Sequence, residues 1–199
     1  MIDLVTDLIT TLTKTPNRIN RSPHWSPDGK LVAFTSNRTG LNELYILSLE
    51  TGEEHQLTNF NSDVEEFCWS PDSQRILATV NRAGALDLAI IDLETGACQY
   101  HHRQGGFHAR PHWSSNDKTI TFEYENPLQP PDIYVYDLET NQTRQLTFSI
   151  PPALAALDFV TPQRVTYPSF DGLEIPSFLY TPQKPNGVSL VYPHGGPTG

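Results

Sequence analysis

The chain has 199 residues, with 23 acidic against 13 basic side chains and a formal net charge of −10. This length suffices for one or two domains, and the acidic balance argues against a nucleic-acid partner, because affinity for phosphates is built from Lys and Arg. No apolar run reaches the ~20 residues needed to cross a membrane, and two cysteines, Cys68 and Cys98, are too few for a disulfide framework.

The first residues are acidic and lack the basic and apolar regions of a secretory signal peptide. We therefore expect a cytoplasmic protein with no membrane partner.

Three tryptophans mark an internal repeat. Trp25, Trp69 and Trp113 stand 44 residues apart and then 44 again, each in a related heptapeptide, at residues 24–30, 68–74 and 112–118. The register continues downstream, where Leu-Glu-Thr follows the three tryptophans by 24, 24 and 25 residues. A repeat of about 40–45 residues is typical of the four-stranded blade of a β-propeller.

Within each copy, short β-rich runs alternate with turns rather than following a helical period. These runs pair up as residues 31–36 with 44–49, 76–80 with 88–93, and 119–124 with 133–138. Short strands at this spacing indicate an all-β architecture. We expect a mainly β chain, with a partial β-propeller of about three four-stranded blades over residues 1–150.

The recurring residues Trp25, Trp69, Trp113, Asp28 and Asp72 each allow a structural and a functional interpretation. The tryptophans could be exposed binding platforms, but we expect them in equivalent buried positions between blades. The two aspartates could bind calcium, but a Ser-Pro-Asp turn explains them without an ion. The third copy lacks the Pro and Gly of the first, so its turn should be looser.

Four histidines cluster at positions 101, 102, 108 and 112. His108 and His112 have the spacing of a helical metal site, but Arg110-Pro111 interrupts any helix, and His112 occupies a repeat position. We therefore expect no metal and no cofactor, while a surface role for His101 and His102 stays open.

The repeat stops after residue 147, and residues 151–164, rich in Pro and Ala, are expected to be a linker. Residues 165–182 predict a β-hairpin around the turn Asp171-Gly172. An apolar run at 188–192, expected to be a strand, then leads into the His-Gly-Gly loop of His194, Gly195 and Gly196. A buried strand feeding such a loop forms half of the oxyanion hole in α/β-hydrolases, although an ordinary Gly-Pro loop would look the same.

The order of these features resembles the prolyl oligopeptidase family of serine peptidases, and most closely its acylaminoacyl-peptidase and dipeptidyl-aminopeptidase branch. The resemblance rests on the Trp-Ser-Pro-Asp-Gly blades, the segment Ser-Phe-Asp-Gly-Leu-Glu-Ile-Pro, and the following His-Gly-Gly-Pro. It implies a propeller that filters peptide substrates above an α/β-hydrolase domain, which would start at residues 165–199. By position, Gly195 and Gly196 match the oxyanion-loop glycines, and His194 stands where some members carry a tyrosine.

The sequence has no Gly-x-Ser-x-Gly elbow, so no catalytic nucleophile, acid or base can be assigned in this chain. We therefore expect an incomplete hydrolase domain and an inactive piece of a larger peptidase, whose partners would be a peptide substrate and the missing remainder of that domain. One alternative is a non-enzymatic TolB-like propeller that binds proteins, and another is an esterase or lipase sharing the His-Gly-Gly loop. We also expect the isolated chain to be marginally stable and to associate.

Overall fold

The computed structural model of the chain describes residues 1–82, 84–102 and 105–193. The chain divides into two compact units, Met1–Ile150 and Pro151–Gly199, and each is described by itself. Among the described residues, no helix is long or apolar enough to span a bilayer.

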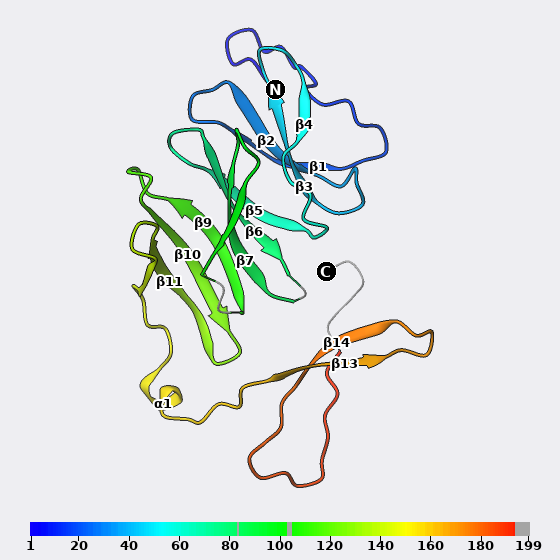
Figure 1. The fold of residues 1–199 in the computed structure, drawn as a ribbon, viewed down its shortest axis with the longest axis vertical. Helices are drawn as coiled ribbons and strands as arrows, with labels where there is room; N and C mark the ends of the chain where they lie inside the picture. The colour runs from blue at the N-terminus through cyan, green and yellow to red at the C-terminus, as the bar shows by residue number, and fades with distance from the viewer. Residues whose placement is uncertain (83, 103–104, 194–199) are drawn as a thin grey trace. The chain divides into compact units, whose positions relative to one another are not determined.

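The first unit consists of three antiparallel four-stranded blades that follow one another along the chain (Figure 1). Blade 1 comprises β1 (Asn20–Trp25), β2 (Leu31–Ser36), β3 (Glu43–Ser48) and β4 (Glu54–Gln56). Blade 2 comprises β5 (Val64–Trp69), β6 (Arg75–Asn81), β7 (Leu86–Asp92) and β8 (Cys98–His101). Blade 3 comprises β9 (Phe107–Trp113), β10 (Thr119–Asn126), β11 (Gln129–Asp137) and β12 (Gln142–Gln145). The predicted mainly β fold with successive four-stranded blades is confirmed.

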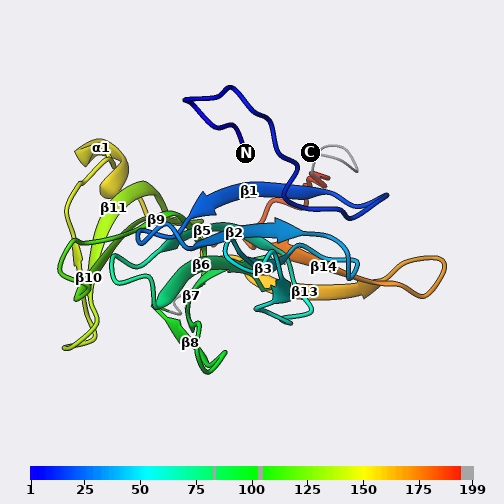
Figure 2. The same ribbon diagram turned by 90° about the horizontal axis from the view of Figure 1, so that it is seen from above.

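Within each blade, each strand pairs with the next one along the chain, because the turns between them are short. Figure 2 shows β8 at the edge of blade 2, beyond β7. Blades 2 and 3 are also joined by a parallel bridge between Leu86 of β7 and Phe107 of β9. A hydrogen bond from the Leu86 amide to the Gly106 carbonyl (3.0 Å) supports this bridge. Blades 2 and 3 therefore share one continuous hydrogen-bonded sheet.

Two apolar clusters fill the spaces between neighbouring blades. The cluster between blades 1 and 2 includes Ala33, Ile46, Phe67 and Trp69. These side chains are buried, so they exclude water from the joint. The cluster between blades 2 and 3 is rich in aromatic side chains, namely Phe122, Tyr124, Tyr134 and Tyr136. A third, smaller cluster covers the other face of blade 1, where Leu12 packs against Phe34 and Tyr45.

The three tryptophans occupy equivalent register positions but differ in burial. Trp25, Trp69 and Trp113 pair with Val32, Ile76 and Ile120 respectively, each seven residues further on. Trp69 is only 8% exposed, whereas Trp25 is 52% exposed, and Trp113 is half-buried. The predicted equivalence is confirmed, but the prediction that Trp25 is buried is wrong.

The burial of each tryptophan depends on the blade that precedes its own. The indole of Trp69 donates a hydrogen bond to the His24 carbonyl of blade 1 (3.0 Å). The guanidinium of Arg75, from blade 2, lies 4.6 Å from the ring centre of Trp113. On the corresponding side of blade 1, the described residues include no further blade, so half of the Trp25 side chain meets solvent.

The second unit begins with one short helical turn, α1 (Pro152–Ala155), and continues with a hairpin of β13 (Gln163–Pro168) and β14 (Glu174–Leu179). The hairpin closes at Asp171-Gly172, where Gly172 has a φ of +84° that glycine adopts without steric cost. The predicted hairpin is therefore present. Within the described residues, β13 and β14 pair only with each other.

Candidate functional site

The predicted oxyanion loop, His194, Gly195 and Gly196, lies outside the described residues, which end at Pro193. The apolar run before it is described, and it is not a strand. Val188, Leu190 and Tyr192 are 79%, 89% and 90% exposed. The prediction of a buried strand at 188–192 is therefore wrong, because none of the described residues of the second unit, up to Pro193, covers these side chains.

The repeated turns hold their acidic residues by local hydrogen bonds. The Ser26 hydroxyl donates to Asp28 (2.6 Å), and the Ser70 hydroxyl donates to Asp72 (2.5 Å). The bond from Ser26 and the Lys30 amide lower the pKa of Asp28. These contacts account for both aspartates as turn residues, without a bound ion.

The third turn keeps the pattern of the first two with longer bonds, as the prediction of a looser turn expects. The Asp117 amide lies 3.3 Å from the Ser114 carbonyl oxygen, and the matching bond of the first turn is 2.9 Å. The Thr119 amide lies 3.2 Å from the Ser114 hydroxyl, and the matching bond of the first turn is again 2.9 Å. The Ser114 hydroxyl donates to the Asn116 side-chain oxygen (2.5 Å), which also accepts the Lys118 amide (3.0 Å). Asp117 takes the left-handed φ of +57° where the first turn has Gly29 at +73°. Aspartate is one of the few residues that tolerate this conformation, so the turn forms without the glycine.

An open groove of about 620 Å³ lies between the segment before β1 and blade 1. Arg38 lines it, stacks 4.0 Å from the Tyr45 ring centre and forms an ion pair with Glu54 at 2.8 Å. The charge of Arg38 is therefore already neutralised within blade 1, and Lys14 is the other basic residue among those that line the groove.

In blades 1 and 3, an acidic residue at or near the start of the third strand holds a threonine that follows the fourth strand. In blade 1, the Thr58 hydroxyl donates to the Glu43 carboxylate (2.5 Å) and accepts the Leu44 amide (2.9 Å). In blade 3, the Thr147 hydroxyl donates to Asp132 (2.7 Å) and accepts the Ile133 amide (2.9 Å). We call this arrangement the acid–threonine clasp.

The clasp of blade 3 has a further set of donors. Burial acts to raise the pKa of Asp132, but hydrogen bonds from Thr147, Ser149 and Gln145 outweigh it, and the pKa is lowered. The carboxylate is thus charged at neutral pH and satisfied on both oxygens. It holds the chain in place where blade 3 ends.

Blade 2 keeps the acidic residue but replaces the threonine. Asp87 occupies the position of Glu43 and Asp132, while His102 occupies the position of Thr58 and Thr147. The His102 Nδ1 lies 2.7 Å from the Nε2 of His108 in β9. The Nδ1 of His108 in turn lies 2.5 Å from the Leu86 carbonyl oxygen of β7. The contact between the two rings thus crosses from blade 2 to blade 3.

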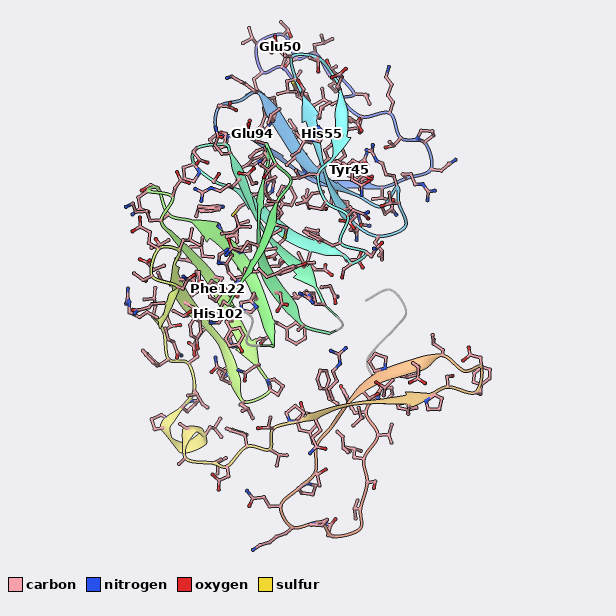
Figure 3. The ribbon with its side chains drawn as sticks, in the orientation of Figure 1. Tyr45, Glu50, His55, Glu94, His102 and Phe122 are labelled. Carbon is pink, nitrogen blue, oxygen red and sulfur yellow. The ribbon has the colours of Figure 1, made fainter. Side chains whose placement is uncertain are left out.

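The two imidazoles are buried among aromatic rings. His108 is 0% exposed and His102 is 9% exposed. Their ring centres lie 5.3 Å and 5.0 Å from that of Phe122, and 4.8 Å and 5.3 Å from that of Tyr124. Figure 3 shows His102 beside Phe122, in blade 3, whereas His55 lies apart, in blade 1.

Burial sets the protonation of both rings. Desolvation, followed by the repulsion of His108, lowers the pKa of His102 to about 4. Desolvation also lowers the pKa of His108, although the Leu86 carbonyl and the Asp87 charge act in the opposite direction. Both imidazoles are therefore neutral at pH 7.

The neighbouring candidates are also buried. His101 is 8% exposed, and its Nδ1 lies 3.4 Å from the Tyr136 hydroxyl, so His101 and His102 do not form an exposed surface. Burial raises the pKa of the Cys68 thiol to about 12, which makes it unreactive at neutral pH. In the described part of the chain, no three His, Cys, Asp or Glu side chains are grouped so that they could hold a metal ion.

The family model of the TolB beta propeller domain matches residues 1–155. The chain belongs to this family. Among curated relatives, it is 40% identical over 48 residues to the Protein TolB homolog of Protochlamydia amoebophila (strain UWE25). It is 53% identical over 38 residues to the Uncharacterized peptidase YuxL of Bacillus subtilis (strain 168). These alignments cover 24% and 19% of this chain, and 10% and 6% of the respective relatives.

Solved structures of two kinds are similar in fold to this TolB-type propeller. A puromycin hydrolase has a TM-score of 0.70 and 22% identity, covering 89% of this chain and 28% of its own. TolB from Acinetobacter baumannii has a TM-score of 0.62 and 24% identity, and the match covers 93% of this chain and 43% of TolB. A puromycin-hydrolyzing peptidase of Mycobacterium tuberculosis has a TM-score of 0.73 and 14% identity, and the match covers 93% of this chain and 29% of the peptidase. At these identities the likeness shows the propeller fold alone, and the chain spans less than half of each of these proteins.

The contact between His102 and His108 is a feature that the sequence pattern did not predict. One signal was present, because His102 stands 44 residues after Thr58 and 45 before Thr147. A comparison of the three repeats position by position marks it as the odd residue. The pairing with His108 has no such signal, because it depends on how blade 3 packs on blade 2.

Proposed function

We propose that this chain is the junction between the propeller and the hydrolase domain of a serine peptidase of the prolyl oligopeptidase family. The observation that carries the proposal is the second unit, where a fourth blade does not follow blade 3. Instead there is an isolated hairpin with an apolar run whose side chains, from Val188 to Tyr192, are largely exposed. Such side chains are normally buried, which fits the first strands of a domain that needs further chain to complete its core.

The comparisons support this proposal from two directions. The peptidase YuxL is 53% identical over a short segment, and two puromycin-hydrolysing proteins share the fold. In a peptidase of this kind, the blades would restrict which peptides reach the active site. We place the chain nearest to the branch that removes acylaminoacyl or aminoacyl groups.

In this proposal the His-Gly-Gly loop contributes backbone donors to acyl transfer. The amide of Gly196 would donate a hydrogen bond to the oxyanion that forms when a serine attacks the substrate carbonyl. Glycine suits this position because it lets the backbone approach the substrate closely. The loop stabilises charge only after attack, and the sequence contains no Gly-x-Ser-x-Gly elbow to supply the nucleophile.

We therefore expect the 199-residue chain alone to be inactive. It should not hydrolyse aminoacyl or acylaminoacyl chromogenic peptides above buffer, and it should not react with a fluorophosphonate. Stoichiometric fluorophosphonate labelling of this chain would contradict the proposal, because it would reveal an activated serine within these residues.

The matched experiment uses the chain extended by the reading frame that follows it in the genome. An in-frame Gly-x-Ser-x-Gly and hydrolysis by the extended protein are expected. In that protein, Gly196→Pro should lower kcat by about 10²–10³-fold, the usual loss on removing one oxyanion donor. Because proline also constrains the loop, binding of a substrate analogue is measured in parallel and should change little.

A TolB-like binding module is the second candidate, favoured by the family of residues 1–155 and by the similarity to TolB from Acinetobacter baumannii. It explains the blades without any catalytic chemistry. An extended protein that carries no elbow and does not react with the fluorophosphonate would favour this module over the peptidase.

A further inference from the structure

The joint between blades 2 and 3 carries the one repeat position where the acid–threonine clasp is absent. In blades 1 and 3, Thr58 and Thr147 close their own blade through hydroxyl groups, which do not titrate near neutral pH. In blade 2, the same position is His102, whose ring reaches His108 of the next blade. A non-titrating contact within a blade is thus replaced by a titratable contact between blades.

The hydrogen bonds fix where the protons lie. The Leu86 carbonyl can only accept, so the His108 Nδ1 must carry the proton that it shares with that oxygen. In the neutral ring, the His108 Nε2 is then an acceptor, and the proton between the two histidines belongs to the His102 Nδ1. The chain of donors therefore runs from His102 to His108 and from His108 to Leu86.

Protonation of either ring places a positive charge in this buried pair. A proton added to the His108 Nε2 turns it into a second donor, so the 2.7 Å contact remains a hydrogen bond only if His102 moves its own proton from Nδ1 to Nε2 and accepts at Nδ1. A proton added to the His102 Nε2 leaves the bond in place, but it puts a charge in a site that is 9% exposed. Two protons would place like charges in contact, so the intact pair resists acid.

The groups around the pair do not remove this penalty. Asp87, on β7, favours a charge on His108, but less than burial disfavours it, and Asp87 also lies 3.8 Å from Arg82. The other titratable neighbours are Tyr124 on β10, Tyr134 and Tyr136 on β11, and His101 on β8, which contacts Tyr136. Burial raises the pKa of Tyr136, which therefore stays neutral across the range in which histidines titrate.

The backbone at this joint depends on the same contact. The bridge between Leu86 and Phe107 and the hydrogen bond from the Leu86 amide to Gly106 lie next to the Leu86 carbonyl that His108 holds. His102 itself has a φ of +48°, a left-handed conformation that a non-glycine residue keeps only when its surroundings enforce it. Loss of the histidine contact would therefore loosen the connection between blades.

We propose that His102 and His108 form an acid-releasable latch, which fastens blade 3 to blade 2 at neutral pH and loosens that joint as the pH falls. We call this pair the histidine latch. It belongs to the propeller itself, and it is independent of whether the chain serves a peptidase or a binding module.

The direction of the pH dependence follows from the pKa shifts. Both histidines have folded-state pKa values below the ordinary value of 6.5, and that of His102 is about 4. The unfolded chain therefore binds more protons between pH 6.5 and 4, and the folded state loses stability as the pH falls through this window. Above pH 6.5 the contribution of the latch is complete.

The first test is an NMR titration of the histidine side chains of the unmodified 199-residue chain, with resonances assigned through single variants. The signal of His102 should remain that of a neutral imidazole down to about pH 5, the pKa of His108 should lie below its ordinary value of 6.5, and both rings should keep the proton on Nδ1 in their neutral forms. A His102 signal that titrates at or above pH 6.5 would overturn the latch. This measurement needs no destabilising substitution.

The second test compares melting temperatures at pH 7.5 and pH 5.0 for the unmodified chain, His102→Asn and His55→Asn. Asparagine tolerates the left-handed backbone of His102 and does not titrate, and His55 is an exposed histidine of blade 1. Acidification should cost the unmodified chain about 4–8 °C more than it costs His102→Asn. The His55→Asn chain should behave like the unmodified one, and an equal loss in all three proteins would refute the proposal.

Discussion

The same residue type at the same repeat position contributes differently to the free energy of unfolding in different blades, as the tryptophans show. Trp69 is buried to 8% exposure and donates to the His24 carbonyl, while Trp25 is 52% exposed. Trp69→Ala should therefore lower the free energy of unfolding by about 3–5 kcal/mol, the usual cost of emptying a buried aromatic site. Trp25→Ala should cost less than about 1 kcal/mol. Urea unfolding of the two variants beside the parent chain measures both values.

Trp25→Ala is the matched control, because it removes the same side chain from the equivalent register position. Equal losses for the two variants would contradict the prediction. That outcome would mean that the Trp25 side chain is covered in solution.

The sequence predicts the position of a residue in the repeat, because the repeat spacing sets it. It does not predict how buried that residue is when burial depends on the neighbouring blade. The sequence placed Trp25 and Trp69 in one register, and the structure confirms it. It could not assign their exposure, because that depends on which surface packs on each blade. The histidine latch is a similar case, since His102 and His108 meet only through packing between blades.

At the scale of elements, the loop that joins blade 2 to blade 3 has one glycine without room for a side chain. Gly106 has a φ of +91°, and an added Cβ would lie 2.4 Å from the Glu125 carbonyl oxygen, which belongs to the backbone and cannot move aside easily. Gly106→Ala should therefore destabilise the chain by about 2–5 kcal/mol, from backbone strain and overpacking together. Chemical denaturation monitored by tryptophan fluorescence measures the change.

Gly105 provides the comparison for Gly106, because it has a φ of +70° with open space where its Cβ would lie. Gly105→Ala should cost only the backbone strain, about 1–3 kcal/mol. If both substitutions cost the same, the close contact between Gly106 and Glu125 would not exist in solution.

The elements that the sequence predicted best are those with repeated turn chemistry. The Ser26 and Ser70 turns and the hairpin at Asp171-Gly172 form as expected, because each is stabilised by hydrogen bonds within a few residues. The apolar run at 188–192 fails for the opposite reason. A strand needs a partner strand to satisfy its backbone, and the described residues of the second unit supply none to this run.

At the scale of the whole molecule, the exposed apolar side chains predict association. Leu190 and Val191 are 89% and 87% exposed, and a contiguous apolar surface of this kind promotes contact between copies. The blades add to this, because unpaired strand edges also recruit other chains. Static light scattering after size-exclusion chromatography should give a mass that rises above the monomer value of 22.3 kDa as concentration increases.

Single substitutions separate the apolar contribution from a change in charge. Leu190→Glu removes one exposed apolar group and adds repulsion to a chain of net charge −10, so it should shift the protein toward the monomer. Gln183→Glu adds the same charge at an exposed polar position nearby and should shift it less. The apolar component should also persist in high salt, which screens charges without weakening hydrophobic contact. A 22.3 kDa monomer at every concentration, for the parent chain and both variants, would show that these surfaces are covered within a single copy.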